Sequence, residues 1–204
     1  MREPQPTLWI IAGPDGAGKT TYAFRHIRAV SGTARFVNLD EISRGLSPLD
    51  PQAEGRRAAR VALEMIDALV REGVSFSLET TLSGRTHLGL AERASAAGFR
   101  VNLLFFAVAS PDTCLARIAR RVSEGGHDVP AADARRRFLR GWRNVVSYAN
   151  VVDLWRVFDN NGPRPIAVAE GGRGCRSVLS PDTDGLPPGL PEPLLTLPPC
   201  AQIP

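Results

Sequence analysis

The sequence predicts an α/β domain in which helices cover both faces of a mainly parallel, five-stranded sheet. Short apolar segments alternate with longer amphipathic ones over residues 8–158, and such alternation is typical of parallel strands joined by helices. A glycine-rich loop separates the first apolar segment from the first helix. With 204 residues, the chain is long enough to bury a core of this kind without disulfides or metals.

The first half of the chain supplies three predicted strands and two predicted helices. Residues 8–13 are an apolar run ended by glycine, the pattern of a strand buried on both faces. The helix after the glycine-rich loop is expected to end near Val30, and apolar residues at helical spacing predict another helix over residues 54–72. The second and third predicted strands are residues 35–39 and 74–78.

The second half alternates in the same way. Its strongest strand signal is residues 101–108, which are nearly all apolar and therefore predict a strand buried on both faces. The remaining predicted elements are helices over residues 85–97, 111–123 and 131–149, and strands over residues 154–158 and, at the sheet edge, 166–169.

The composition changes after Gly162, and this change sets the predicted domain boundary. Ten of the 17 prolines lie in residues 163–204, which have little periodic apolar pattern. We therefore expect one folded domain over residues 1–162 and a Pro/Gly-rich C-terminal tail over residues 163–204 that is partly or wholly disordered, at least beyond Gly171.

The cysteines and the N-terminus bear on the cellular compartment. Cys114, Cys175 and Cys200 are far apart and form no CxxC motif, which argues against a disulfide framework and against a zinc site. No apolar run approaches the ~20 residues of a membrane span, and residues 1–6 lack the apolar stretch of a signal peptide. We expect a cytoplasmic protein with no membrane association.

Arginine dominates the basic residues and is unevenly placed. Lys19 is the only lysine among 25 basic residues. From Asp112 to Arg143 there are eight arginines against four acids, a surplus equal to the whole net charge of +4. One basic segment without interleaved aromatic residues suits a compact polyphosphate at least as well as a nucleic-acid backbone. A nucleic-acid partner is therefore the less favoured prediction.

Residues 13–20, Gly-Pro-Asp-Gly-Ala-Gly-Lys-Thr, match the P-loop pattern G-x-x-x-x-G-K-[ST]. The match lies between a predicted strand and a predicted helix, as a P-loop requires. Backbone N–H groups of such a loop hold phosphate oxygens, its lysine reaches the β- and γ-phosphates and its hydroxyl ligates Mg²⁺. The sequence thus predicts the P-loop nucleoside triphosphate hydrolase and kinase fold, with Thr20 as metal ligand. The predicted nucleotide-binding residues are Gly13, Pro14, Asp15, Gly16, Ala17, Gly18, Lys19, Thr20 and Thr21.

Carboxylates follow two of the predicted strands. The most apolar strand has no acid at its end, whereas Asp40 and Glu79 follow the second and third strands. Because the carboxyl ends of parallel strands line the ligand crevice, Asp40 is placed to deprotonate an acceptor hydroxyl as a general base. Glu79 is placed to hold acceptor hydroxyls or a metal-bound water. The alternative for each acid is a helix cap.

Two arginine-bearing helices joined by a Gly-Gly hinge resemble a lid. Arg117 and Arg121 are four residues apart and share one helix face, and residues 135–137 are arginines early in the next helix. A lid of this kind excludes water and stabilises charge on a transferring phosphoryl group. The alternative is a solvated basic face, and His127 in the hinge is either a ligand contact or a loop-structuring residue.

Four segments together resemble the zeta toxin family of P-loop kinases. They are the P-loop, Phe-Val-Asn-Leu-Asp-Glu-Ile at 36–42, Glu-Thr-Thr-Leu-Ser at 79–83 and Arg-Ile-Ala-Arg-Arg-Val-Ser-Glu-Gly-Gly-His-Asp-Val-Pro at 117–130. The resemblance spans about residues 7–162. It departs from the family at Asp15, where asparagine is frequent, and at Leu39, where alanine is frequent, and the chain is a compact version of the fold.

The resemblance implies an ATP-dependent kinase that acts on a small hydroxyl substrate. The best-known members phosphorylate a sugar hydroxyl of UDP-N-acetylglucosamine, and an antitoxin protein is the implied partner. By position, Lys19 and Thr20 would hold ATP and Mg²⁺. The implied catalytic residues are Lys19, Asp40, Arg121 and one arginine of the 135–137 run, for which we choose Arg136. The implied acceptor-binding residues are Asp40, Glu79 and Thr80.

Two other functions remain open from the sequence. A nucleotide-binding interaction module would not turn over substrate, although strand-end acids and a lid argue against a mere binder. A polynucleotide or RNA-linked kinase is suggested by the basic segment, and it would show a steep salt dependence of oligonucleotide binding.

Overall fold

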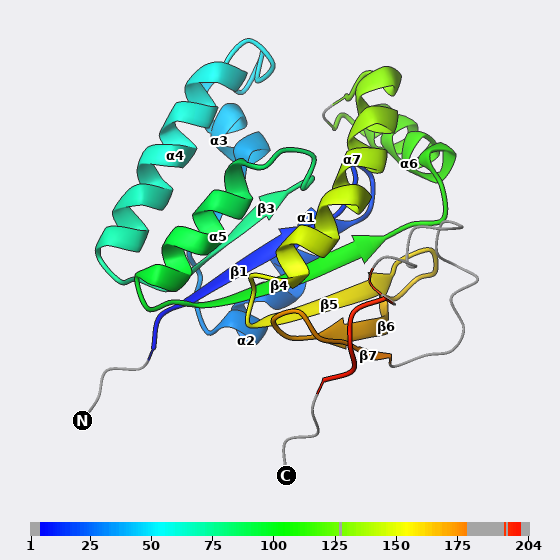
Figure 1. The fold of residues 1–204 in the computed structure, drawn as a ribbon. Helices are drawn as coiled ribbons and strands as arrows, with labels where there is room; N and C mark the ends of the chain where they lie inside the picture. The colour runs from blue at the N-terminus through cyan, green and yellow to red at the C-terminus, as the bar shows by residue number, and fades with distance from the viewer. Residues whose placement is uncertain (1–4, 127, 179–193, 195, 201–204) are drawn as a thin grey trace.

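A computed structural model describes residues 5–126, 128–178, 194 and 196–200, which form one seven-stranded sheet flanked by helices (Figure 1). The strand order is β2-β3-β1-β4-β5-β6-β7. The first five strands are parallel to one another. β6 runs antiparallel to β5, and β7 runs antiparallel to β6. The predicted fold class is confirmed, although the sheet has seven strands and not five. The strand predicted over residues 166–169 forms as β6, but it is not at the sheet edge because β7 pairs with it on the outer side. The strands are β1 (Thr7–Ala12), β2 (Phe36–Val37), β3 (Phe76–Thr80), β4 (Arg100–Ala107), β5 (Leu154–Asp159), β6 (Ile166–Gly171) and β7 (Ser177–Val178).

Helices connect the parallel strands, as the alternating pattern predicts. None of the described helices has the length and apolar character needed to cross a membrane. The first helix is α1 (Lys19–Tyr22), which continues through a π-helical segment (Ala23–Ile27) into α2 (Arg28–Ser31). The others are α3 (Leu39–Leu46), α4 (Gly55–Arg71), α5 (Thr86–Ala96), α6 (Pro111–Ser123) and α7 (Ala131–Ala149).

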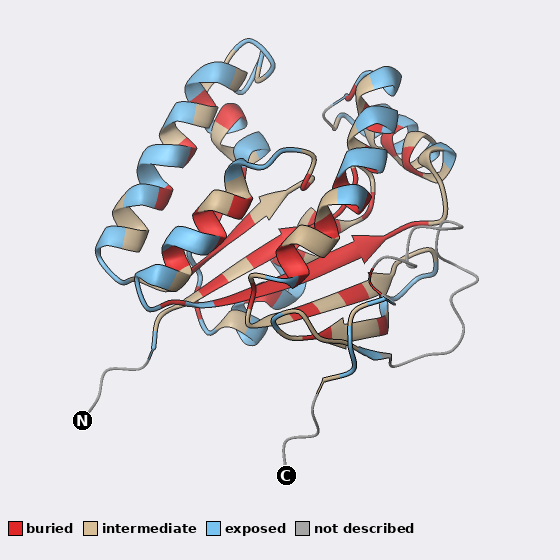
Figure 2. Ribbon diagram, in the orientation of Figure 1, coloured by how far each residue is buried: buried red, intermediate tan, exposed pale blue. Residues whose placement is uncertain are grey.

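Neighbouring residues of β4 show that helices cover both faces of the sheet. Successive side chains of a strand point to opposite faces. Phe105 packs edge-on against Trp142 of α7, with ring centroids 4.8 Å apart. Phe106 instead contacts Tyr22 of α1, with ring centroids 4.7 Å apart. The buried residues accordingly concentrate in the central strands and on the helix faces turned toward them (Figure 2).

The second strand is shorter than predicted, and this changes the place of Asp40. The Asn38 side chain accepts a hydrogen bond from the backbone N–H of Glu41 at 3.1 Å and so caps α3. Asparagine is among the best N-cap residues because its oxygen satisfies a free N–H of the first turn. Asp40 therefore lies in the first turn of α3 and not at the end of a strand.

Part of the predicted tail packs on the sheet. β6 pairs with β5, and β7 pairs with β6. The backbone N–H of Arg176 donates to the carbonyl of Pro198, and that of Cys200 donates to the carbonyl of Arg176. Residues 179–193, 195 and 201–204, on which most of the predicted disorder falls, lie outside the described residues, as does His127.

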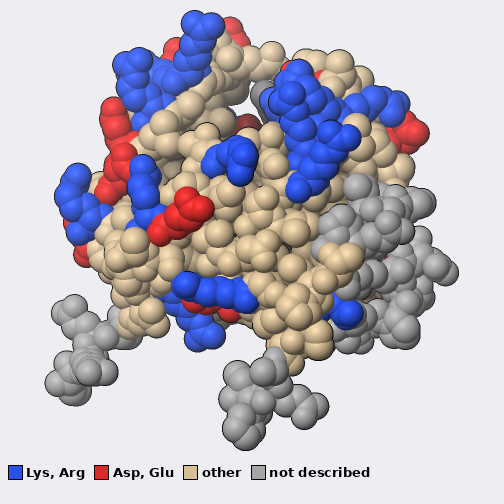
Figure 3. Space-filling view, in the orientation of Figure 1, with Lys and Arg blue, Asp and Glu red and all other residues tan. Residues whose placement is uncertain are grey.

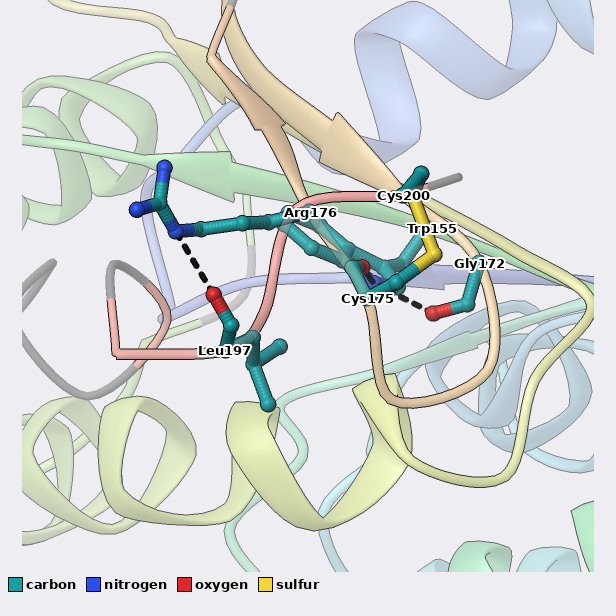
Figure 4. Close-up of a disulfide and its surroundings, with 6 residues drawn as sticks. All are labelled: Trp155, Gly172, Cys175, Arg176, Leu197 and Cys200. Carbon is teal, nitrogen blue, oxygen red and sulfur yellow. Dashed lines mark hydrogen bonds between the residues drawn. A yellow bond between two sulfur atoms is a disulfide. The ribbon is translucent and has the colours of Figure 1, made fainter. Parts of the chain in front are cut away.

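The cysteines correct the sequence argument. Cys175 and Cys200 form a disulfide, and the Arg176 side chain beside it donates from Nε to the carbonyl of Leu197 at 2.8 Å (Figure 4). The argument against a disulfide framework missed this pair because the chain returns alongside residue 176, and sequence separation did not reveal this approach. Only Cys114 is free among the described residues. The cytoplasmic location loses its cysteine argument and stays a prediction.

We predict that loss of this disulfide destabilises the protein without abolishing the fold. The bridge closes a loop with a sequence separation of 25, for which restriction of the unfolded chain contributes about 3 kcal/mol. Cys175→Ser should lower the free energy of unfolding by up to that amount in urea titrations.

Alkylation followed by mass spectrometry checks the pairing directly. Unfolded, unreduced protein should take up one alkyl group, and reduced protein three, because three cysteines are present. In the native protein Cys114 should react slowly, since burial raises its thiol pKa to about 12. Three alkyl groups without reduction would contradict the disulfide.

Candidate functional site

The glycine-rich loop between β1 and α1 has the backbone of a P-loop. Gly13 and Gly16 have φ angles of +144° and +76°, a region that favours glycine because it has no Cβ. A Cβ on Gly13 would lie 2.3 Å from the carbonyl oxygen of Phe106, and one on Gly16 would lie 2.8 Å from that of Cys114. The loop can therefore pass this close to β4 and α6 only with glycine at both positions.

Lys19 begins α1 and lies over the loop. Its side chain is 6% exposed, and Nζ donates a hydrogen bond to the carbonyl oxygen of Pro14 at 2.8 Å. Nζ also lies 3.8 Å from Oε1 of Glu79. The buried ammonium thus has acceptors on two sides, at a helix N-terminus whose free N–H groups favour anions. Thr21, the following predicted nucleotide contact after Thr20, is exposed on α1.

The register of the sheet brings Glu79 to the P-loop. β3 lies beside β1, with Ile11 paired to Glu79 and Ala12 paired to Thr80. The Thr20 hydroxyl lies 2.9 and 3.0 Å from the two Glu79 carboxylate oxygens, and the Asn38 amide donates to Oε2 at 2.8 Å. The sequence predicted Thr20 as a metal ligand and Glu79 as a contact of acceptor hydroxyls or of a metal-bound water, and the structure joins the two residues in one cluster.

Burial changes the protonation of this cluster. Glu79 is 13% exposed, and desolvation raises the pKa of its carboxyl above the ordinary value. The Lys19 ammonium and the Thr20 and Asn38 hydrogen bonds oppose this rise, while the Asp40 carboxylate adds to it. A cation placed at Thr20 and Glu79 would favour the ionised form, and hydroxyl and carboxylate oxygens are ligands that Mg²⁺ accepts.

A pocket of about 450 Å³ opens beside this cluster. Figure 3 shows a hollow between the α3–α4 side and the α6–α7 side of the molecule, with basic side chains on both flanks. Asp40 lines the pocket from the first turn of α3, and Lys19 and Glu79 form part of its wall. Its apolar lining residues are Val37, Leu39, Ala59, Ala62, Leu63, Ile66 and Leu78, and its other polar ones are Asp15, Asn38, Thr80, Thr81, Ser83, Thr86, His87 and Arg137.

The arginine at the pocket is Arg137, one residue after the predicted Arg136. Arg137 Nη1 lies 3.4 Å from Asp15 Oδ2 of the P-loop, whereas Arg136 pairs with Asp133 at 2.8 Å and does not line the pocket. Adjacent residues point about 100° apart on a helix of 3.6 residues per turn, so only one of them can face the site. The sequence did not reveal which.

Arg117 and Arg121, expected to share a phosphate-facing side, differ in their surroundings. Arg117 Nη2 donates to the carbonyls of Asn160 and Asn161 at 2.9 and 3.0 Å, so it links α6 to the loop after β5. The Nε and Nη2 atoms of Arg121 are buried and have no hydrogen-bond partner among the described residues. Buried guanidinium donors of this kind suit an anionic ligand.

The helices that carry these arginines share a small apolar cluster. Ile118 of α6, Ala134 of α7 and Val129 of the intervening loop are buried together. This cluster is separate from the main core. The two helices are therefore packed against each other, and their closure as a lid stays a prediction.

Comparison with known proteins identifies the family of this chain. A family model described as an AAA domain matches residues 8–142, which is more than half of the chain. The chain belongs to the AAA domain family. The matched part of this AAA domain begins in β1 and ends in α7, so it contains the P-loop, Asp40, Glu79 and Arg137.

A relative in Haemophilus influenzae, named only as an uncharacterized protein, is 28% identical over 127 residues, 59% of this chain and 89% of that protein. Among solved structures, the AvrRxo1-ORF1:-ORF2 complex matches with a TM-score of 0.66 and 20% identity over 86% of this chain. The PezAT chromosomal toxin-antitoxin system of Streptococcus pneumoniae matches with a TM-score of 0.59 and 16% identity, over 82% of this chain and 72% of that one.

These structural matches establish the P-loop fold and nothing finer, because the sequence identities are low. This protein spans 61% of the length of the AvrRxo1 chain that it matches. It spans 49% of the matching chain from the Pnkp1/Rnl/Hen1 RNA repair complex, with a TM-score of 0.56 and 18% identity over 81% of this chain.

Glu79 should make the protein's stability depend on pH in a defined direction. Its folded-state pKa is raised, so its contribution to folding is largest below the ordinary glutamate pKa and is lost as the pH rises through the raised value. We predict that the free energy of unfolding of wild type, relative to Glu79→Gln, falls as the pH rises from about 4, the ordinary glutamate pKa, toward neutral.

Urea unfolding of both proteins across that pH range measures the difference. Glutamine keeps an oxygen that can accept the Thr20 and Asn38 hydrogen bonds, so the comparison isolates the carboxyl proton. A difference that stays flat, or that grows with pH in favour of wild type, would contradict the raised pKa.

Proposed function

We propose that this AAA domain protein is an ATP-dependent phosphotransferase of the zeta toxin type, which transfers the γ-phosphoryl group to a hydroxyl of a small molecule. One observation carries the proposal. Lys19 of the P-loop and Glu79 of β3, which the Thr20 hydroxyl contacts, line a pocket that Asp40 also lines from α3. A nucleotide-binding module has no use for such a side pocket, whereas a kinase must hold an acceptor beside the γ-phosphate.

The residues divide the work of phosphoryl transfer. The P-loop amides and Lys19 hold the β- and γ-phosphates, and Thr20 and Glu79 would hold Mg²⁺, which neutralises charge on the phosphates when bound. Asp40 takes the proton from the acceptor hydroxyl as its oxygen bonds to the γ-phosphorus. The bond to the β-phosphate oxygen breaks, and ADP leaves. Arg137 and Arg121 stabilise charge on the transferring group.

The acceptor and the protein partner are proposed from resemblance to known proteins. UDP-N-acetylglucosamine is the first acceptor to test because of the zeta toxin resemblance. An antitoxin partner is supported by PezAT, which is described as a toxin-antitoxin system.

An ATP-consumption screen tests the proposal. ADP release is measured with UDP-N-acetylglucosamine, nucleosides and small sugars, with Lys19→Ala as the control for contaminating activity. At least one acceptor should raise ADP release by wild type and not by Lys19→Ala. ATP binding without stimulation by any acceptor would favour a non-catalytic nucleotide-binding module.

Asp40→Asn should separate binding from chemistry. The substitution removes the proton acceptor but leaves the P-loop intact. The affinity for ATP, measured by calorimetry, should therefore stay within about twofold of that of wild type. Phosphoryl transfer should fall about 100- to 10,000-fold, the range for loss of a general base. Lys19→Ala should lose both. Equal turnover in Asp40→Asn and wild type would remove the base assignment.

Neighbouring arginines of α7 provide a matched pair of variants. Arg137 faces the pocket and Arg136 pairs with Asp133 outside it. Arg137→Ala should lower kcat/KM by about 100-fold or more, as for loss of one charge-stabilising donor. Arg136→Ala loses only an exposed ion pair, of about 0–1 kcal/mol, and should stay within about threefold. The reverse order would restore Arg136 as the phosphate contact.

A further inference from the structure

His87 is a pocket residue that the sequence analysis passed over. It lies in the first turn of α5 (Thr86–Ala96) and lines the pocket together with Asp40 and Thr80. Its Nδ1 atom lies 3.2 Å from the Thr80 hydroxyl oxygen. Thr80 follows Glu79 at the end of β3, so His87 is joined directly to the strand that carries the buried carboxylate.

The loop between β3 and α5 is held in a fixed shape around this pair. Leu82 is fully buried and has a φ of +57°, the only positive φ at a non-glycine position in the described chain. Its backbone N–H donates to the Thr80 hydroxyl oxygen at 3.1 Å, and its carbonyl accepts from the Asn144 side chain at 2.8 Å. Left-handed backbone at a branched residue persists only where its surroundings impose it, and it concentrates at ligand sites.

One arrangement of protons pairs every polar atom of this contact. The Thr80 oxygen accepts from Leu82, and His87 Nδ1 is the one acceptor within reach of the Thr80 hydrogen among the described residues. We assign the tautomer in which Nδ1 accepts and the ring proton is on Nε2, because the other tautomer leaves the Thr80 hydrogen without an acceptor. Burial lowers the pKa of His87, which favours this neutral form. Nε2 has no partner within the described residues.

We infer that His87, oriented by Thr80, is a hydrogen-bond donor for a second oxygen of the acceptor, while Asp40 receives the reacting hydroxyl. The inference rests on the proposed function. It names the substrate class as a molecule with a reacting hydroxyl and a further hydroxyl or carbonyl oxygen near it. Ala59, Ala62 and Ile66 of α4 also line the pocket, and this apolar part of the lining fits the carbon face of a ring. Sugars and nucleosides have this chemistry, and a cyclic alcohol with one oxygen does not.

Two substitutions distinguish the donor from a structural role. His87→Gln retains an N–H donor near the position of Nε2. His87→Asn places its amide near Nδ1, where the oxygen can accept from Thr80, and leaves no donor near the position of Nε2. With whichever of N-acetylglucosamine, UDP-N-acetylglucosamine or adenosine stimulates ADP release, His87→Asn should raise the KM for the acceptor about 3- to 10-fold, the value of one neutral hydrogen bond. The KM for ATP should change less. Glutamine should restore most of the loss.

The same exchange at another histidine is the control. His26 is exposed on the π-helical segment and lies outside the pocket lining, so His26→Asn should leave both constants at wild-type values. Equal KM values in His87→Asn and His87→Gln, or a change in the KM for ATP as large as that for the acceptor, would overturn the donor role.

An NMR measurement tests the subsite independently of turnover. In protein labelled with ¹⁵N-histidine, the His87 signals, assigned with His87→Gln, should show a protonated Nε2 and an unprotonated Nδ1 near neutral pH. N-acetylglucosamine or adenosine should shift Nε2, whereas cyclohexanol, a ring with one oxygen, should not. A protonated Nδ1, or no shift with any compound, overturns the inference. The expected shift without any phosphoryl transfer would instead reject the proposed kinase and keep the subsite.

Discussion

The pairing of β1 with β3 is the constraint on which the site depends. Parallel pairing sets Ala12 opposite Thr80 and Ile11 opposite Glu79. The P-loop begins at the residue that follows β1. A shift of one residue would turn Glu79 to the other face of the sheet. The buried carboxylate, the Thr20 hydroxyl and the Lys19 ammonium meet because backbone hydrogen bonds deep in the core fix this register. The chemistry of the site thus depends on backbone pairing as well as on the side chains that line the pocket.

Buried charge in this cluster is tolerable only because it is shared. An isolated carboxylate at 13% exposure would be expensive to ionise, and a partner cation with hydrogen-bond donors offsets that cost. Lys19, Thr20 and Asn38 approach Glu79 from three different segments. The raised pKa of Glu79 shows that they do not offset its desolvation fully. A site left in this condition has a driving force to take up a cation or a proton.

Local patterns predicted the fold well and the site in part. Amphipathic periodicity located α4 and α7 closely, and the P-loop motif located the glycines and Lys19. The pattern did not reveal that Asn38 would cap a helix and so place Asp40 in its first turn. The sequence also gave no basis for choosing Arg137 over Arg136, because the packing of α7 on β4 determines which side chain faces the pocket. His87 was missed for a similar reason, since its contact with Thr80 arises only when α5 folds back against β3. The Cys175–Cys200 pair depends on a return of the chain that sequence spacing does not encode.

The Asp15–Arg137 contact bears on how quickly a reaction cycle can turn over. In the proposed kinase, a phosphate that binds Arg137 would have to compete with Asp15 for the guanidinium. The same carboxylate would compete with the product phosphates and so help them to leave. An aspartate within the P-loop would therefore lower the affinity for phosphate and speed its release.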